Sequence, residues 1–592
     1  MKKITLLLIS LLWLCSSFHT NAAAGKQNES FEQLAEQIWQ YELQQSPLMA
    51  AYYGVNIKPD EMPDISPQAL KMQYQQNQKY LQLLQDMNVE FLSEQNQINL
   101  AILKHKLSDA VASYKYQAHQ IPITAEGGFH TNLGFIPRMV QLTSKQDVEN
   151  YLSRLAQFPQ YFDQHIEYMK QGLASGNSQP QAVLKGFEQS VDGFIVKDPT
   201  ESLFYNPMKA NLTFLDKGEL DQFQQHAKEV IATKVIPAYQ NFRGFITNQY
   251  IPNARASIGV KETPHGTAFY QNRAKHFTTT NLTAEQIHAL GLSEVKRIRQ
   301  EMAEIIKDVK FDGSFAEFLH FLRTDEQFYP KTAEELLKEA SFIAKKMDAQ
   351  LPKFFKVLPR TPYGVAPVPE HIAPKYTTGR YVGPSKDTDP GYYWVNTYAL
   401  DRRPLYELEA LTLHEAVPGH HLQISLNREM EDTPLYRSSY YISAFGEGWG
   451  LYSEWLGLEA GFYQDPYSNF GRLTYEMWRA TRLVVDTGMH IMDWSRQQAI
   501  DYMKQNSALS EHNITTEVDR YISWPGQALS YKIGELTIKR LRKEAEQKLA
   551  SKFDIREFHY HVLKNGSVPL SLLEQQILVY IQDELNQVQL SN

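Results

Sequence analysis

Hydrophobic residues recur every three to four positions through most of this chain, which is the period of an amphipathic helix. Residues 30–43 place Phe31, Leu34 and Ile38 on one face, and residues 291–309 repeat the pattern with their charges on the other face. Such stretches indicate helices that pack on a core and turn a solvated back to water. The chain is therefore predicted to be mostly α-helical.

Residues that cap helices mark where several of these helices begin. Thr283 and Thr332 are each followed three positions later by Gln or Glu, which is the pattern of a capping box. Ser144 stands in the same way before another helical stretch. These signals fix helix starts independently of the hydrophobic period.

A few segments lack the helical pattern. Residues 190–210 and 250–280 are predicted to be loops, and residues 358–400 are dense in Pro, Gly, Tyr and Thr. Within the last of these, the run YYWVNT at 392–397 favours a short strand just before a long helix. No linker or repeat interrupts the chain, so residues 25–592 are expected to form a single helical domain.

Residues 1–24 have the three parts of a secretory signal peptide. Lys2 and Lys3 precede an apolar run from Ile4 to Leu14, and three alanines at 22–24 offer a cleavage site. The run is too short to span a bilayer as a mature helix. We therefore expect a periplasmic or secreted protein with no integral membrane segment once the signal is removed.

Cys15 is the only cysteine among 592 residues. Lipid attachment through Cys15 is the alternative to cleavage after the alanines, but Leu14 stands where a small residue is expected. Cleavage after the alanines leaves no thiol, which excludes disulfides and Cys-bound metals. The net charge of −8 argues against a nucleic-acid partner.

The candidate chemistry lies in the segment LTLHEAVPGHHLQ, residues 411–423. A zinc-hydrolase helix of the His-Glu-x-x-His type holds two His at i and i+4 on one face. Here His414 is followed by His420 at i+6 and His421 at i+7, and neither spacing brings both rings to one ion on a regular helix. Glu415 stands beside the first His, where it can take a proton from a metal-bound water.

Two residues inside this segment provide a remedy for the spacing. Pro418 cannot donate a helical hydrogen bond, and Gly419 tolerates unusual backbone angles. Together they can bulge two residues outward, so that His414 and His420 act as i and i+4. Neutral imidazoles in a chain without thiols suit Zn²⁺, which typically takes three protein ligands in a catalytic site.

The third ligand is expected from the segment FGEGWGLYSE, residues 445–454, which is predicted to be helical despite three glycines. The glycines are expected to allow another helix to approach closely, because each costs about 1 kcal/mol in a helix interior. Glu447 is the favoured ligand. Glu454 is the alternative ligand, or else a hydrogen-bonding partner of a ligand imidazole.

Hydrolysis of a peptide bond also needs a donor for the oxyanion that forms. His490, Arg520, Tyr521 and Tyr531 lie further along the chain and are the candidates for this role. Each is as consistent with a structural role as with a catalytic one.

Several motifs together resemble the bacterial family called domain of unknown function 885. They are HEAVPGHHLQ, FGEGWGLYSE, RLVVDTGMH and RYISWPGQALSYKIGEL, preceded by GLSEVKRIRQEM, FLRTDEQFYP and PGYYWVNT. The family in turn resembles the helical zinc peptidases of the thimet-oligopeptidase, angiotensin-converting-enzyme and carboxypeptidase Taq groups. The resemblance implies a large helical body with a deep central channel and a short β-sheet beside the zinc helix.

The resemblance also implies roles for particular residues. The shared Gly-His selects His420 over His421 as the second zinc ligand and places the third ligand at Glu447, with Glu415 as the base. The strand at 392–397 would bind the substrate backbone by strand addition, which makes Tyr392, Tyr393 and Asn396 candidate substrate-binding residues.

Three functions remain open from the sequence. The first is a zinc peptidase that acts on oligopeptides outside the cytoplasm. The second is an amidase that uses the same metal site on peptidoglycan peptides. The third is a non-catalytic helical binding protein that keeps the scaffold of an enzyme, although such a scaffold needs no base at Glu415.

Overall fold

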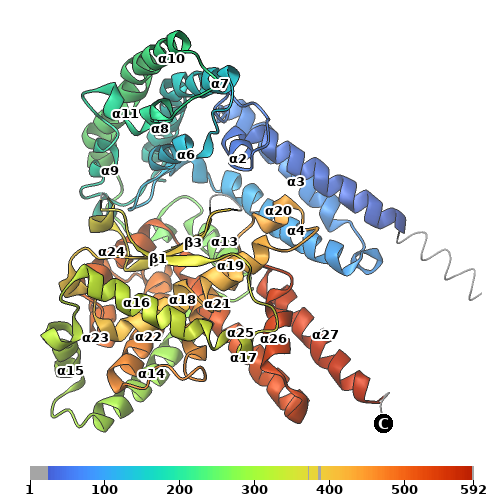
Figure 1. Ribbon diagram of the computed structural model, residues 1–592, viewed down its shortest axis with the longest axis vertical. Helices are drawn as coiled ribbons and strands as arrows, with labels where there is room; N and C mark the ends of the chain where they lie inside the picture. The colour runs from blue at the N-terminus through green and yellow to red at the C-terminus, as the bar shows by residue number, and fades with distance from the viewer. Residues whose placement is uncertain (1–24, 371, 385–387, 590–592) are drawn as a thin grey trace, which may run out of the picture. The chain divides into compact units, whose positions relative to one another are not determined.

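The computed structural model describes residues 25–370, 372–384 and 388–589, so the predicted signal peptide lies outside the described residues. The fold is mostly α-helical, as predicted, with one small sheet (Figure 1). The chain divides between Ser257 and Ile258 into two compact units. The sequence marks no linker at this boundary.

The first unit is built of helices. Residues 25–45 are helical, which confirms the helix predicted over 30–43. The further helices are α2 (Pro47–Tyr52), α3 (Pro67–Gln85), α4 (Glu94–Lys115), α5 (Phe129–Asn132), α6 (Ile136–Met139), α7 (Lys145–Ala156), α8 (Phe158–Ser175), α9 (Gln189–Asp192), α10 (Lys217–Val230), α11 (Ile236–Phe245) and α12 (Ile251–Asn253). The long helices α3 and α4 pack side by side (Figure 1).

The second unit contains the remaining helices and the strands. Its helices are α13 (Gly266–Thr278), α14 (Ala284–Asp308), α15 (Phe315–Thr324), α16 (Ala333–Asp348), α17 (Leu351–Phe354), α18 (Leu408–Glu415), α19 (His420–Arg428), α20 (Leu435–Ser438), α21 (Ser443–Leu456), α22 (Pro466–Ile491), α23 (Arg496–Asn506), α24 (Glu511–Ser523), α25 (Ser530–Leu549), α26 (Ile555–Leu563) and α27 (Leu570–Gln589). All the candidate site residues described below belong to this unit.

Local signals set the ends of several helices as predicted. Thr283 and Gln286 form a reciprocal capping box at the start of α14. The Ser144 hydroxyl accepts a hydrogen bond from the Asp147 N–H at the start of α7. The prediction of a loop over 250–280 is wrong for α13, whose buried face carries mostly small residues, so its hydrophobic period is faint.

The core of the second unit forms where α14 packs along α22. Ile298 and Met302 of α14 are fully buried against Met477 and Val484 of α22. Gly291 allows the two helices to approach, because a Cβ at this position would lie 2.7 Å from the Leu483 Cβ. The predicted face of residues 291–309 is thus the packed face.

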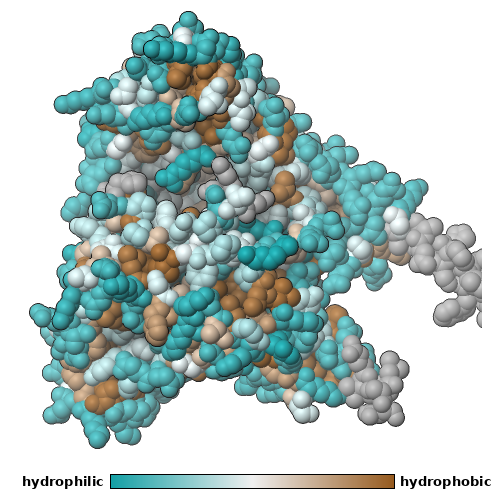
Figure 2. All heavy atoms as spheres, in the orientation of Figure 1, coloured by the Kyte–Doolittle hydropathy of each residue, from teal (hydrophilic) through white to brown (hydrophobic). Residues whose placement is uncertain are grey.

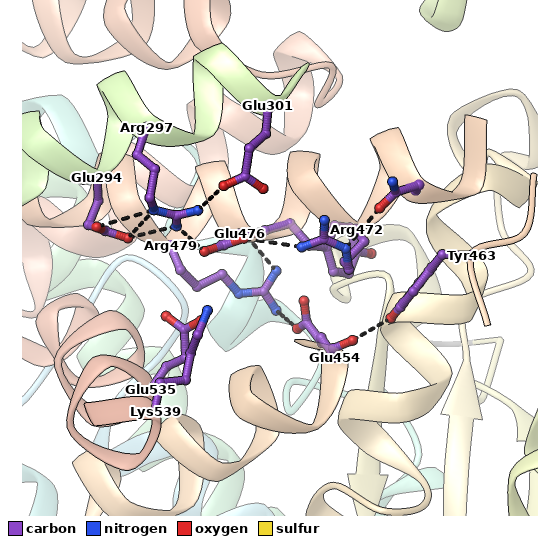
Figure 3. A network of polar contacts seen from close by, with 12 residues as sticks. Glu294, Arg297, Glu301, Glu454, Tyr463, Arg472, Glu476, Arg479, Glu535 and Lys539 are labelled. Atoms are coloured by element: carbon purple, nitrogen blue, oxygen red, sulfur yellow. Dashed lines mark hydrogen bonds and ion pairs between the residues drawn. The ribbon is translucent and has the colours of Figure 1, made fainter. Parts of the chain in front are cut away.

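A buried ionic cluster joins three helices of this core. The Lys532 ammonium of α25 has no exposed surface and lies 2.8 Å from Glu476 of α22, 3.1 Å from Glu294 of α14 and 2.6 Å from Glu535. Arg297 of α14 joins the cluster through an ion pair with Glu476 (Figure 3). Removing one partner of such a buried cluster leaves an uncompensated charge, so the cluster fixes how these helices meet.

The sheet has three strands in the order β1-β3-β2. The strand β1 (Tyr363–Pro367) runs parallel to β3 (Gly391–Val395), and β2 (Gly379–Val382) runs antiparallel to β3. The predicted strand over 392–397 is therefore confirmed as β3, the central strand. Both of its edges are already paired, which leaves β1 and β2 as the edge strands.

The sheet lies beside the helices α18 and α19, as the resemblance implied (Figure 1). None of the described helices combines the length and apolar character that crossing a bilayer requires. Hydrophilic residues dominate the surface seen in Figure 2, with hydrophobic positions in separate patches. The deep central channel stays a prediction.

Candidate metal centre

The histidine motif is interrupted where Pro418 and Gly419 predict a break. The helix α18 ends at Glu415, residues 416–419 form a turn, and α19 begins at His420. The indole N–H of Trp449 donates to the Pro418 carbonyl at 2.8 Å and holds the turn. The extra residues of the motif are thus taken up by the turn rather than by a regular helix.

The turn brings His414 and His420 together. Their ring centroids lie 4.7 Å apart and their planes are nearly perpendicular, at 86°. Glu447 of α21 faces both rings, with its Oε2 3.6 Å from His414 Nε2 and 3.4 Å from His420 Nε2. Three helices therefore direct one donor atom each to a common point, and these atoms all lie within 4.8 Å of one another.

The spacing of these donors fits a tetrahedral zinc ion. Zinc bonds of about 2.0–2.2 Å to nitrogen and oxygen place tetrahedral donor atoms roughly 3.4 Å apart. The two distances to Glu447 are 3.4 and 3.6 Å. Two imidazoles and one carboxylate are also a donor set that zinc takes in catalytic sites.

Charge at the site also favours a cation. Burial lowers the pKa of His414, but hydrogen bonds to Glu447 and Glu454 outweigh burial and raise that pKa to about 9. Burial raises the pKa of Glu447, but His420 and His414 hold it well below its usual range. The carboxylates thus stabilise positive charge between the rings, which a divalent metal supplies.

Glu454 orients His414 rather than joining the donor set. Its Oε1 lies 2.7 Å from His414 Nδ1, the nitrogen that points away from Glu447. Arg479 of α22 lies 3.4 Å from the same carboxylate oxygen, and Figure 3 shows this guanidinium reaching Glu454. Of the two roles that the sequence leaves open for Glu454, the structure supports the hydrogen-bonding partner of a ligand imidazole.

Glu415 lies beside the donor set and is held by the sheet. The backbone N–H of Tyr381 in β2 donates to Glu415 Oε2 at 2.8 Å. Glu415 is 9 % exposed. This hydrogen bond fixes the carboxylate next to His414, where a base for a metal-bound water is expected.

The glycines of α21 let neighbouring groups approach this helix, and at Gly448 the neighbour is another helix, as predicted. A Cβ on Gly448 would lie 2.5 Å from the Gly534 Cα of α25, and a Cβ on Gly450 would lie 2.7 Å from the His414 ring. Gly446 makes room for the ring of Tyr441. The three glycines therefore serve three different contacts around one ligand.

Two tyrosines stand close to the donor set. The Tyr441 hydroxyl donates to Glu447 Oε1 at 3.1 Å. Tyr531 packs on Arg482, with 4.2 Å from the guanidinium carbon to the ring centroid, and burial and Glu447 raise the pKa of its hydroxyl. Tyr441 is 43 % exposed as a residue, but desolvation of its hydroxyl and the charge of Glu447 likewise raise its pKa well above the usual range, so both hydroxyls stay protonated as donors.

The other candidates for the oxyanion donor are engaged elsewhere. His490 accepts from the Val260 N–H at Nδ1 and contacts the Tyr521 carbonyl at Nε2. The Tyr521 hydroxyl donates to Glu517 at 2.6 Å, and Arg520 bonds to the same carboxylate. These contacts show that His490, Tyr521 and Arg520 each hold neighbouring groups together, and a catalytic role for them stays a prediction.

His421, the alternative second ligand, faces the sheet. Its Nδ1 lies 3.0 Å from the Tyr381 hydroxyl and its ring packs 4.4 Å from that of Tyr363. Burial lowers the pKa of His421 to about 4. Of the two candidates, His420 is therefore the one that joins His414 and Glu447.

The expected substrate-binding role of β3 needs correction. Its backbone is paired on both sides, so no further strand can be added there. Tyr393 is fully buried, and the Asn396 amide donates to three backbone carbonyls at 373, 376 and 377. Tyr392 alone of the three is exposed, at 40 %.

Three residues near the site carry no motif that would have singled them out. Tyr381 acts through its backbone N–H, which no side-chain pattern reveals. Tyr441 precedes α21 by two positions, and only its closeness in sequence to Glu447 offers a hint. Arg479 lies on a fully buried stretch of α22, and a charge in such a stretch indicates a buried partner.

Comparisons with solved structures find two that are similar to most of this chain. A crystal structure described as that of a "putative lipoprotein" from Colwellia psychrerythraea is 28 % identical, with a TM-score of 0.84 over 94 % of this chain and 99 % of that one. A structure from Shewanella oneidensis, described as a "putative lipoprotein of unknown function", is 17 % identical and shares the fold, with a TM-score of 0.73 over 93 % of this chain and 99 % of that one.

No curated protein matches the chain. The sequence profile of a bacterial family described as proteins of unknown function, DUF885, matches residues 47–577. That match includes the histidine motif and the Glu447 helix. The chain belongs to the DUF885 family.

Proposed function

We propose that this protein is a zinc-dependent peptidase that acts outside the cytoplasm. The observation that carries the proposal is the meeting of His414, His420 and Glu447 at zinc-like spacing with Glu415 beside them. A zinc ion at this point would acidify a water molecule and polarise a carbonyl group. His414, His420 and Glu447 would hold the ion.

Glu415 acts as the general base in this proposal. It accepts a proton from the attacking water and passes the proton to the leaving amine nitrogen. The hydrogen bond from the Tyr381 N–H orients one carboxylate oxygen and leaves the other for the proton. Glu454 holds His414 in the orientation that directs Nε2 to the metal position.

Tyr441 and Tyr531 stabilise the oxyanion. Both hydroxyls are protonated and lie near Glu447. The Tyr441 hydroxyl donates to Glu447 Oε1 at 3.1 Å. When a tyrosine hydroxyl donates to the substrate carbonyl oxygen in place of Glu447, that hydrogen bond becomes stronger as negative charge develops on the oxygen.

The edge of β2 is the proposed place for the substrate backbone. Tyr381 sends its N–H to Glu415 rather than to β3, so this edge of the strand faces the base. An extended peptide that pairs with the edge lies with its carbonyl groups near Glu415. The substrate class is therefore peptides in an extended conformation.

The extracytoplasmic location rests on two observations. The predicted signal peptide precedes the described residues. The two related structures are described as "putative lipoproteins", a class that is attached to membranes outside the cytoplasm. Signal cleavage and lipid attachment are distinguished by the mass of the mature N-terminus.

The substitution Glu415→Gln tests the proposal, with Glu334→Gln on the exposed face of α16 as a matched control. Hydrolysis of a mixed peptide library, followed by mass spectrometry, should fall about 10²–10⁴-fold in the Glu415 variant and stay unchanged in the control. Equal cleavage by both variants would contradict the role of the base. Zinc binding without cleavage of any peptide, including peptidoglycan peptides, would favour the binding protein.

A further inference from the structure

A second polar cavity lies in the same unit, away from the metal ligands. It has a volume of about 170 Å³ and is bounded by residues 401–407, the start of α24 and Arg323 of α15. Asp401, Arg402 and Glu511 are exposed at its rim, whereas Tyr406 and Glu407 are buried. A cavity of roughly 150 Å³ admits a molecule the size of benzene, so a small metabolite fits.

The cavity contains polar groups that the protein leaves unsatisfied. The Tyr406 hydroxyl and the Arg403 Nε are buried without a hydrogen-bond partner, and Tyr406 is 4 % exposed. Glu407 is 6 % exposed and makes no close ion pair with any residue that the structure describes. Buried polar and charged groups without partners are costly, so this combination indicates a place that a ligand completes.

The remaining charges of the cavity are accounted for by the protein. Arg323 donates to the backbone carbonyls of Ser507, Ala508 and Leu509, which hold its positive charge in place. Glu511 pairs with Lys504 at 2.7 Å. Asp401 and Arg402 are exposed to solvent at the rim, so the charges left for a ligand inside the cavity are the guanidinium of Arg403 and the carboxyl of Glu407.

We propose that this cavity binds a small zwitterion of the α-amino acid class. The ligand carboxylate meets Arg403, the ligand ammonium meets Glu407, and the Tyr406 hydroxyl donates a further hydrogen bond to the carboxylate. Burial raises the pKa of Glu407 to about 8 despite nearby arginines. An ammonium group beside this carboxyl favours its ionised form and so forms a full ion pair.

This site is separate from the metal centre and does not depend on the proposed peptidase. Glu407 stands immediately before α18, seven residues ahead of His414, which is about 10 Å along a helix axis. A separate pocket of about 20 Å³, which shares Arg403 and Glu407 with the larger cavity, reaches Leu411, one turn before His414, and is too small for an amino acid. A ligand in the larger cavity therefore does not touch the donor set.

Isothermal titration of the full chain, as purified with its metal, tests the proposal. L-alanine carries both charges, whereas acetate and ethylammonium carry one each. L-alanine should bind one site per chain, at least about tenfold more tightly than either single-charge probe. Binding of acetate as tight as that of L-alanine would overturn the zwitterion assignment, and so would the absence of L-alanine binding.

Variants locate the site and separate it from amino-acid binding at the metal. Arg403→Gln should weaken L-alanine binding at least about tenfold with unchanged zinc content, whereas Arg556→Gln, an exposed control on α26, should bind as the parent does. Glu407→Gln keeps the shape of the side chain and should reduce L-alanine affinity to that of acetate, with acetate affinity unchanged. Undiminished L-alanine binding in both cavity variants would overturn the proposal.

Discussion

At the scale of residues, the two histidines proposed as metal ligands are held differently. His414 has Glu454 behind it at 2.7 Å, and Arg479 fixes that carboxylate in turn, whereas the Nδ1 of His420 is buried without a hydrogen-bond partner. A carboxylate behind a ligand imidazole fixes the tautomer and raises the basicity of the ligand. The orientation of His414 therefore depends on Glu454.

The substitution Glu454→Gln should weaken zinc binding about 10–100-fold without changing its stoichiometry of one. The measurement is competition for zinc against a chromogenic chelator. Glu431→Gln, at an exposed position outside the site, is the matched control. An unchanged zinc affinity in the Glu454 variant would show that Glu454 does not support the ligand.

Asp486 of α22 makes the stability of the second unit depend on pH. Burial raises the pKa of this carboxyl to about 7, even though it accepts hydrogen bonds from the Tyr270 hydroxyl and the Gly526 N–H. The unfolded carboxyl has a pKa of about 3.9. Between these values the folded state binds the proton more tightly, so this contribution to the free energy of unfolding falls as pH rises from about 4 to 7.

The substitution Asp486→Asn removes this titration and keeps an oxygen that accepts the same hydrogen bonds. The variant should gain stability relative to the parent as pH rises from 4 to 8. The gain in the free energy of unfolding is about 1.4 kcal/mol for each pH unit between the unfolded and the folded pKa of Asp486. Urea unfolding at several pH values measures the difference. A difference that does not vary with pH would contradict the raised pKa.

At the scale of elements, the glycines of α21 determine how closely three neighbours approach Glu447. Gly450 faces the His414 ring, and a Cβ there would lie 2.7 Å from the ring's Nε2. Gly450→Ala should therefore displace the ring, weaken zinc binding and destabilise the protein by about 1–3 kcal/mol. Zinc titration and thermal unfolding measure the two effects.

Gly244→Ala is the matched control for this prediction. Gly244 lies within α11, and a Cβ there meets nothing within 4 Å. Alanine at such a helical position should be neutral or stabilising by up to about 1 kcal/mol. Unchanged zinc affinity in the Gly450 variant would mean that α18 and α21 adjust without moving the ligand.

Helix starts and breaks that depend on neighbouring residues could be predicted from the sequence, whereas the position of a strand in the sheet, which depends on distant contacts, could not. The capping box at Thr283 and the helix break at Pro418 depend on neighbouring residues, and both were found in the sequence. The place of β3 at the centre of the sheet depends on pairing with β1 and β2, which are separate segments earlier in the chain. The sequence therefore indicated the strand but not its central place in the sheet.

At the scale of the whole molecule, the donor set occupies a small part of the chain. His414, His420 and Glu447 fall within 34 positions of the second unit, on the helices α18, α19 and α21. The short span explains why the meeting of these three side chains was predictable, because local helix geometry largely decides which side chains meet. The division at Ser257 was not predictable, since no change of composition marks it.

Zinc stoichiometry of the purified chain and two single variants tests the central claim most directly. The parent should bind one zinc ion, His420→Ala should lose it, and His421→Ala, altered at the adjacent position, should retain it. Equilibrium dialysis followed by elemental analysis gives the three values. Zinc bound by the His420 variant but not by the His421 variant, or no zinc in the parent, would contradict the metal centre described above.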